Sequence, residues 1–242
     1  MAGEYRVPKR RQPVFKIVGG IFRLFLGCKV VNTTDTPLPK QAIIISNHNA
    51  KSGPMAIEVS FPMFNVKWGA GEMFGGFSSR YNYLRNILYI QKLGKGKLSA
   101  TLRACFEAIF SPMLYKGMKF IPTFTDMRFL HTVKCSEAVL DAGESVLIFP
   151  EDSSKGYLDE ITKALPGFVM LAELYNKKKD CDIPILPLYY HKRTRRILVG
   201  EAFSEKTLCE QGLTREEIAE VGRQRINGLY NAYCKSPEEK QE

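Results

Sequence analysis

Two short segments place residues that can do acid–base chemistry at the end of an apolar run. Ser46-Asn47-His48 follows the run 42–45, and Phe149-Pro150-Glu151 ends the run 146–149. A histidine and a carboxyl group at such positions can do acid–base or hydrogen-bond chemistry. In α/β proteins, groups of this kind emerge where strands end, at the carboxyl edge of a sheet. The two segments therefore predict one shared site that contains His48 and Glu151.

Segments of strand and helix character alternate along the chain without internal repeats. Short apolar runs predict strands at 42–46, 65–69, 119–123, 145–149, 185–190 and 196–200. Helical periodicity predicts helices at 54–61, 98–110, 131–142, 167–177 and 216–233. We expect Pro112 to end the helix 98–110, which is apolar enough to be either deeply buried or in contact with lipid. The alternation predicts an α/β fold with a mainly parallel sheet flanked by helices.

The composition indicates a folded, basic protein with an anionic partner. The chain has 242 residues, 45% of them hydrophobic, and a formal charge of +10, so it can bury a full core. The charge alone is compatible with nucleic acid, a membrane surface or a phosphorylated substrate. The basic run 94–97 lacks the Ser or Thr of a phosphate-binding loop, and the run 191–196 lacks aromatic residues that stack on bases. We therefore expect both runs to be exposed turns.

The cysteines and histidines do not indicate a metal centre. None of the six cysteines forms a Cys-x-x-Cys pair, and the three histidines are widely separated. Neither a zinc site nor a disulfide framework is expected, and the cysteines are interpreted as reduced thiols of a cytosolic compartment.

A basic amphipathic segment lies near the amino terminus. Arginines and lysines at 6–11 precede the segment 14–31, whose larger apolar residues gather on one helical face. Its uncharged runs are too short to span a bilayer. Two interpretations remain open: a helix in the membrane interface, attracted to anionic headgroups, or a helix packed on the protein core. We expect residues 1–40 to form a basic arm, an amphipathic membrane-interface helix and a linker, and residues 41–242 to form the α/β domain.

Four motifs in order resemble those of the glycerolipid (lysophospholipid) acyltransferase superfamily, between residues 42 and 200. The first, Asn-His followed after four residues by Asp, resembles Asn47-His48, with Gly53 at the Asp position. The second resembles Gly117-Met118-Lys119-Phe120-Ile121, with Thr123 where an Arg is usual. The third, Phe-Pro-Glu-Gly-Thr-Arg, resembles Phe149-Pro150-Glu151-Asp152-Ser153-Ser154, followed by Lys155, and the fourth resembles Ile183-Pro184-Ile185-Leu186-Pro187-Leu188.

This resemblance implies an enzyme that moves a fatty acyl group to a hydroxyl of a lysophospholipid acceptor, similar to 1-acylglycerol-3-phosphate, in phospholipid synthesis. The implied acyl donor is acyl-CoA or acyl carrier protein, and neither a metal nor an organic cofactor is expected. His48 would be the general base, in a catalytic set with Glu151 and Asp152. Because Gly53 replaces the Asp that orients the imidazole, Asp152, Glu151 and Glu58 are candidates to orient it, as is a backbone carbonyl.

The remaining implied residues would bind substrate. They are Gly117, Phe120, Arg128, Ser153, Ser154, Lys155 and Pro184. Lys155 and Arg128 would supply the charge that the family's arginines give to an acceptor phosphate. Lys155 and Asp152 are equally compatible with a solvated turn, and the two serines with local caps.

The implied location is the cytoplasmic face of a membrane with anionic lipids, where the protein would be peripheral or monotopic. A nucleic-acid partner is not expected. A second function stays open: a catalytically degenerate relative that binds lipid or an acyl carrier without turnover.

Overall fold

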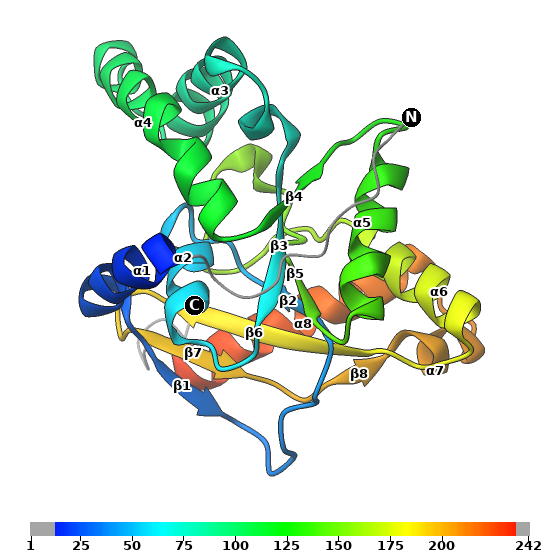
Figure 1. The fold of residues 1–242 in the computed structure, drawn as a ribbon. Helices are drawn as coiled ribbons and strands as arrows, with labels where there is room; N and C mark the ends of the chain where they lie inside the picture. Colours follow the sequence, from blue (N-terminus) through cyan, green and yellow to red (C-terminus); the bar gives the residue numbers. More distant parts are fainter. Residues whose placement is uncertain (1–12, 236–242) are drawn as a thin grey trace.

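The computed structural model describes residues 13–235, with side chains from residue 17 onward. Within that range eight strands form one sheet, in the order β1-β7-β6-β2-β5-β3-β4, and β8 pairs with β6 (Figure 1). The strands are β1 (Lys29–Asn32), β2 (Ile43–Ser46), β3 (Asn65–Ala70), β4 (Phe120–Thr123), β5 (Ser145–Ile148), β6 (Pro184–His191), β7 (Arg196–Val199) and β8 (Phe203–Ser204). Most neighbours are parallel, whereas β6 runs antiparallel to β7 and β8. The α/β fold with a mainly parallel sheet is confirmed.

Helices cover both faces of the sheet. One face carries α5 (Phe129–Asp141), α6 (Gly167–Lys179) and α8 (Arg215–Tyr233), which follows α7 (Glu205–Glu210). The other face carries α2 (Ser52–Ser60), and α1 (Pro13–Leu26) lies against α2. In the central strand β2, Ile43 and Ile45 join the first core and Ile44 joins the second. An uninterrupted isoleucine run makes this strand because both of its faces are buried.

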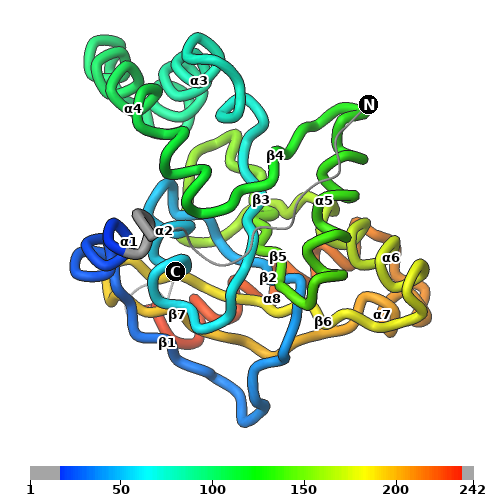
Figure 2. The backbone as a smooth tube through the Cα atoms, viewed as in Figure 1, coloured from blue at the N-terminus to red at the C-terminus, as the bar shows by residue number. Residues whose placement is uncertain are grey.

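Between β3 and β4 the chain leaves the sheet in residues 71–117, which we call the helical excursion. It contains η1 (Gly71–Phe74), α3 (Phe77–Asn82), the π-helical segment η2 (Tyr83–Lys92) and α4 (Lys97–Gly117). Figure 2 shows α3 and α4 side by side, standing away from the sheet. A separate apolar cluster joins the small residues Ala100, Ala104 and Ala108 of α4 to Leu84 and Leu88 of η2. Only the α4 part of this excursion was expected from the sequence.

The expectation that Pro112 ends its helix is wrong, because α4 continues through Pro112 for another turn. A proline inside a helix lacks the N–H that would bond the carbonyl four residues earlier. In this helix that carbonyl belongs to Ala108, and Nε of Arg80 donates to it at 2.9 Å. The guanidinium of α3 therefore replaces the missing helical hydrogen bond.

The segment 14–31, expected as one amphipathic helix, contains two elements. The helix α1 ends at Leu26, and Lys29–Asn32 forms the edge strand β1, which pairs in parallel with β7. In the described part of the chain no helix is both long and apolar enough to cross a membrane.

Candidate functional site

The carboxyl edge of the sheet brings His48 and Glu151 together. β2 and β5 are parallel neighbours, with Ile45 opposite Ile148, so the residues after them emerge at the same edge. The backbone N–H of His48 donates to Oε2 of Glu151 at 3.2 Å. Burial raises the pKa of the Glu151 carboxyl, and this hydrogen bond offsets part of the rise. Glu151 therefore holds the backbone of His48 rather than its imidazole.

The turn that follows β2 is closed too tightly for an aspartate at position 53. The amide of Asn47 bonds to the backbone of the neighbouring strand β6, and Asn49 and Ala50 adopt left-handed φ angles of 42° and 53°. A Cβ atom on Gly53 would lie 2.1 Å from the carbonyl oxygen of His48. This backbone thus requires glycine at the position where the family motif has its Asp.

Aromatic rings enclose the imidazole of His48. Its centroid lies 4.7 Å from the ring of Phe149 and 5.1 Å from the ring of Tyr157, which is stacked on it at 26°. Its Nδ1 is shielded from solvent and has no hydrogen-bond partner within the described part of the chain. Burial, and to a lesser degree the charge of Lys92, lower the pKa of His48 to about 4. The ring is therefore neutral at neutral pH and able to accept a proton.

The three carboxyl groups considered as partners of the imidazole are engaged elsewhere. Glu151 binds the backbone of His48, and Oδ1 of Asp152 accepts the N–H of Ser154 at 3.2 Å, which helps to lower the pKa of Asp152. Glu58 forms a buried ion pair with Lys67 of β3. The carboxylate expected to replace the family's Asp is therefore not found at Nδ1.

Lys92, at the end of η2, is a site residue that the sequence analysis missed. Its Nζ donates to Oγ of Ser153 at 2.7 Å and lies 5.6 Å from the centroid of the Tyr157 ring. Burial lowers the pKa of Lys92, whereas Glu151 and Asp152 raise it. The helical excursion thus brings a cation to the turn that carries Glu151. Its only signal in the sequence is proximity to the basic run 94–97, and the signal for Tyr157 is the turn glycine before it.

The turn after Glu151 places the predicted serines and lysine differently. Ser153 contacts Lys92, as described above, whereas Ser154 and Lys155 are exposed in η3 (Ser153–Lys155). Asp152 caps this turn through Ser154. The turn therefore offers one serine to the site and presents Lys155 to the solvent beside it.

Three predicted binding residues belong to α4, to β4 and to the loop after β4. Gly117 is buried at the end of α4, and Phe120 of β4 stacks on Tyr115 at 4.5 Å. β4 lies three strands from β2 in the sheet. Arg128 is paired with Asp126 at 2.7 Å on an exposed turn.

Pro184 is placed at the opposite edge of the sheet. It begins β6, whereas Leu188, four residues further along β6, lies opposite Ser46. Four residues of strand span about 13 Å. The fourth motif therefore supplies mainly core strand residues, and the assignment of Pro184 to substrate binding stays a prediction.

An open hollow of about 450 Å³ adjoins the site. Its lining residues come from three segments at the carboxyl edge, namely the loops after β2 and β5 and the end of β6 with the turn that follows: Asn49, Tyr157, Leu158, Asp159, His191, Lys192 and Arg193. Tyr157 contacts both this hollow and the imidazole of His48. Within residues 17–235 no group of three or more His, Cys, Asp or Glu side chains is arranged to hold a metal ion. The arrangement offers a neutral base, a nearby lysine and a basic hollow.

The sequence has no significant match to a protein-family model or to a curated protein. Comparison with solved structures finds a distant likeness to the 1-acyl-sn-glycerophosphate (LPA) acyltransferase PlsC from Thermotoga maritima. The two chains share 14% sequence identity, and the TM-score is 0.48 over 89% of this chain and 80% of that chain.

Proposed function

We propose that this protein is a glycerolipid O-acyltransferase. It transfers a fatty acyl group from a thioester of coenzyme A or acyl carrier protein to a hydroxyl of a lysophospholipid similar to 1-acylglycerol-3-phosphate. The observation that carries the proposal is the neutral imidazole of His48 at the carboxyl edge, with Glu151 bound to its backbone and Lys92 nearby. The order of the four sequence motifs supports the same chemistry.

The proposed step uses His48 as a general base. The imidazole takes the proton of the acceptor hydroxyl while the hydroxyl oxygen attacks the thioester carbonyl carbon. The carbon–sulfur bond of the resulting tetrahedral adduct then breaks, and the thiolate leaves and takes the proton back from the imidazolium. General-base assistance of this kind contributes roughly 10² to 10⁴ in rate. A low pKa makes His48 a weak base but keeps it unprotonated at neutral pH.

Lys92 is the side chain that we assign to the acceptor phosphate. It is half-buried, and its electrostatic neighbours include His48 and Glu151. A charged hydrogen bond in such a setting is stronger than one at an exposed position such as Lys155. Lys155 lies on the turn that carries Ser153, and it adds positive charge beside the site.

We further propose that the protein is peripheral or monotopic, on the cytoplasmic face of a membrane. Ile21, Leu24 and Phe25 of α1 are exposed, Leu24 to 77%, which supports the interfacial interpretation of α1 over core packing. A basic hairpin, residues 192–196, lies beside them, and Arg195 donates to the carbonyl of Phe25 at 2.9 Å. The six cysteines are unpaired, which is compatible with a reducing compartment.

A second candidate is the catalytically degenerate lipid or acyl-carrier binder. Two observations favour it: Nδ1 of His48 has no partner among residues 17–235, and Tyr157 covers the imidazole. In analogous systems, loss of the orienting carboxylate costs roughly 10⁴ in rate. Under this alternative the site binds a ligand, but no thioester is consumed.

The test is to supply acyl-CoA with and without 1-acylglycerol-3-phosphate, then measure free thiol and identify the lipid product by mass. Acceptor-dependent thiol release with a diacylated product supports transfer. Thiol release that does not depend on acceptor indicates hydrolysis and contradicts transfer. Binding of the lipid without thiol release supports the degenerate binder.

A further inference from the structure

The outer face of α4 carries large apolar side chains that contact no core. They recur every three or four residues along one stripe of the helix: Leu98, Leu102, Phe106, Ile109 and Met113, with Phe110 alongside. Leu102 is 65% exposed and Phe106 is 64% exposed. The inner face packs through the small residues Ala100, Ala104 and Ala108. A helix with its large apolar residues outside and its alanines inside reverses the usual pattern of a soluble protein.

The charge around this stripe favours an anionic surface. Residues 77–119 contain eight lysines and arginines but one acidic residue, Glu107. That glutamate is occupied by Lys51 and by the hydroxyl of Tyr89. A second copy of this chain would place one excess of positive charge against another, because a twofold interface repeats the same patch on both partners. Anionic lipid headgroups complement both the apolar stripe and its basic surroundings.

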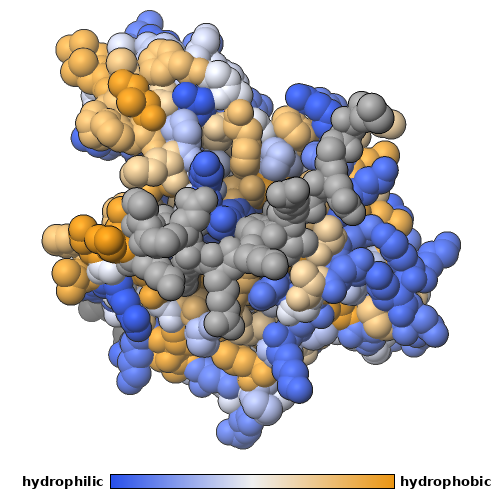
Figure 3. Space-filling model, viewed as in Figure 1, coloured by the Kyte–Doolittle hydropathy of each residue, from blue (hydrophilic) through white to orange (hydrophobic). Residues whose placement is uncertain are grey.

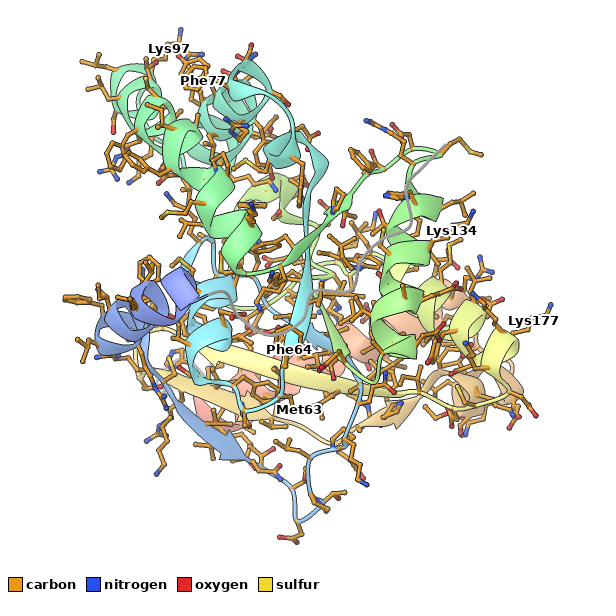
Figure 4. The ribbon with its side chains drawn as sticks, in the orientation of Figure 1. Met63, Phe64, Phe77, Lys97, Lys134 and Lys177 are labelled. Carbon is orange, nitrogen blue, oxygen red and sulfur yellow. The ribbon has the colours of Figure 1, made fainter. Side chains whose placement is uncertain are left out.

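The stripe lies on the same side of the molecule as the exposed face of α1 (Figure 3). α1 packs on α2, and Lys51, immediately before α2, forms the ion pair with Glu107 of α4. Figure 3 shows apolar surface over α4 and over α1 on the same side of the molecule. Figure 4 shows Phe77 and Lys97 at the outer end of the excursion, whereas Lys134 and Lys177 lie on the opposite side. The two helices can therefore contact one flat surface together.

The same helices are attached to the candidate site. Lys92 of η2 bonds to Ser153, and Lys51, bonded to Glu107 of α4, lies three residues after His48. A surface in contact with α4 would therefore lie beside the loops that hold the imidazole. This arrangement suits a substrate whose acyl chain stays in the lipid layer.

We propose that the apolar stripe of α4, with α1, docks on the surface of a bilayer that contains anionic lipid. The stripe enters the headgroup boundary, and the lysines and arginines around it contact the headgroups. This extends the membrane association in the proposed function, on which it rests, and assigns that association to a second element.

The first experiment measures sedimentation with vesicles of phosphatidylcholine and phosphatidylglycerol, and with vesicles of phosphatidylcholine alone. We expect the double variant L102Q/F106Q to bind the anionic vesicles at least about tenfold more weakly than wild type, because each large apolar side chain contributes roughly that factor or more. The matched control M127Q/L130Q removes two exposed apolar side chains at α5, across the molecule. It should bind as wild type does.

The second experiment uses the wild-type chain and needs no variant to fold. Cys105 lies three residues after Leu102 on α4, and Cys209 lies on α7; both thiols are exposed. A charged thiol reagent should label both in solution. Anionic vesicles should suppress labelling of Cys105 and leave that of Cys209 unchanged, as measured by mass spectrometry of the peptides.

Three results would overturn the proposal. The first is that L102Q/F106Q binds anionic vesicles as strongly as wild type does. The second is equal labelling of Cys105 with and without vesicles. The third is self-association of the wild-type chain that L102Q/F106Q loses while it keeps vesicle binding. The last would assign the stripe to a second copy of the chain. None of these measurements uses catalysis, so failure of the thiol-release test would leave the docking surface standing, and failure here would leave acyl transfer standing.

Discussion

Acid should destabilise this protein through His48, and the size of the effect follows from the site. Burial and the charge of Lys92 lower the pKa of His48 from 6.5 to about 4 in the folded chain. At about 1.4 kcal/mol per pKa unit, this difference corresponds to roughly 3 kcal/mol of stability. The figure is an upper limit because His48 keeps partial solvent exposure.

The sign follows from proton binding in the two states. Between pH 6.5 and about 4 the unfolded chain binds a proton at His48 and the folded chain does not. The free energy of unfolding therefore falls as the pH falls through this window. Above the window the imidazole is neutral in both states, and none of this stability is lost. Between pH 7.5 and pH 5 we expect His48 to account for a loss of about 2 kcal/mol.

The assay is urea unfolding of wild type and H48Q across this pH range. The unfolding free energy of wild type minus that of H48Q should fall by about 2 kcal/mol from pH 7.5 to pH 5, since only wild type carries an imidazole at position 48. Effects of Glu151 cancel in the difference, because its hydrogen bond is to the backbone at position 48. H131Q, which removes an exposed imidazole, is the matched control. A pH-independent difference for H48Q, or a directly titrated pKa near 6.5, would refute the reasoning.

Three further predictions concern the turn, the acceptor and the anchor. G53A should lower the free energy of unfolding by about 1–3 kcal/mol through its clash with the carbonyl of His48. G228A, where a Cβ meets nothing within 4 Å, should raise the free energy of unfolding by up to about 1 kcal/mol. Equal effects of the two substitutions in urea unfolding would contradict the clash. K92Q should raise KM for a phosphate-bearing acceptor roughly tenfold or more and spare an uncharged one, with a smaller effect for K155Q; an equal rise for both acceptors would remove Lys92 from phosphate binding. Deletion of residues 1–26, which spares β1, should weaken sedimentation with anionic vesicles and leave a cooperative thermal transition; unchanged sedimentation would rule out α1 as an anchor.

The sheet was predictable because its strands are short, buried and rich in β-branched residues. Ile43, Ile44 and Ile45 form one such run, and the strand at 145–148 is another. Once both are placed as parallel neighbours, the meeting of His48 and Glu151 follows from the topology. The closeness of these two residues thus depends on local pattern and on one topological rule.

The details that depend on contacts between distant segments were not predictable. Pro112 is tolerated because Arg80, thirty-two residues earlier, bonds the orphaned carbonyl. Lys92 reaches the site because η2 returns to the turn after β5, where Nζ of Lys92 bonds to Ser153 across sixty-one residues of sequence. The tight turn at Gly53 depends on two successive left-handed residues, and the second of them, Ala50, is of a type that rarely adopts this conformation. Pro184 does lie in a strand, as expected, but at the end of β6 that is opposite the carboxyl edge of the sheet. The register between β6 and β2 decides this position.

The most direct test of acyl transfer compares thiol release by wild type and H48Q with acyl-CoA and 1-acylglycerol-3-phosphate. We expect wild type to release thiol in proportion to acceptor, and H48Q to lose roughly 10² to 10⁴ of that rate, while its vesicle binding and its cooperative unfolding at pH 7.5 persist. Release without dependence on acceptor, or an H48Q variant as active as wild type, would contradict the role of His48 as the base.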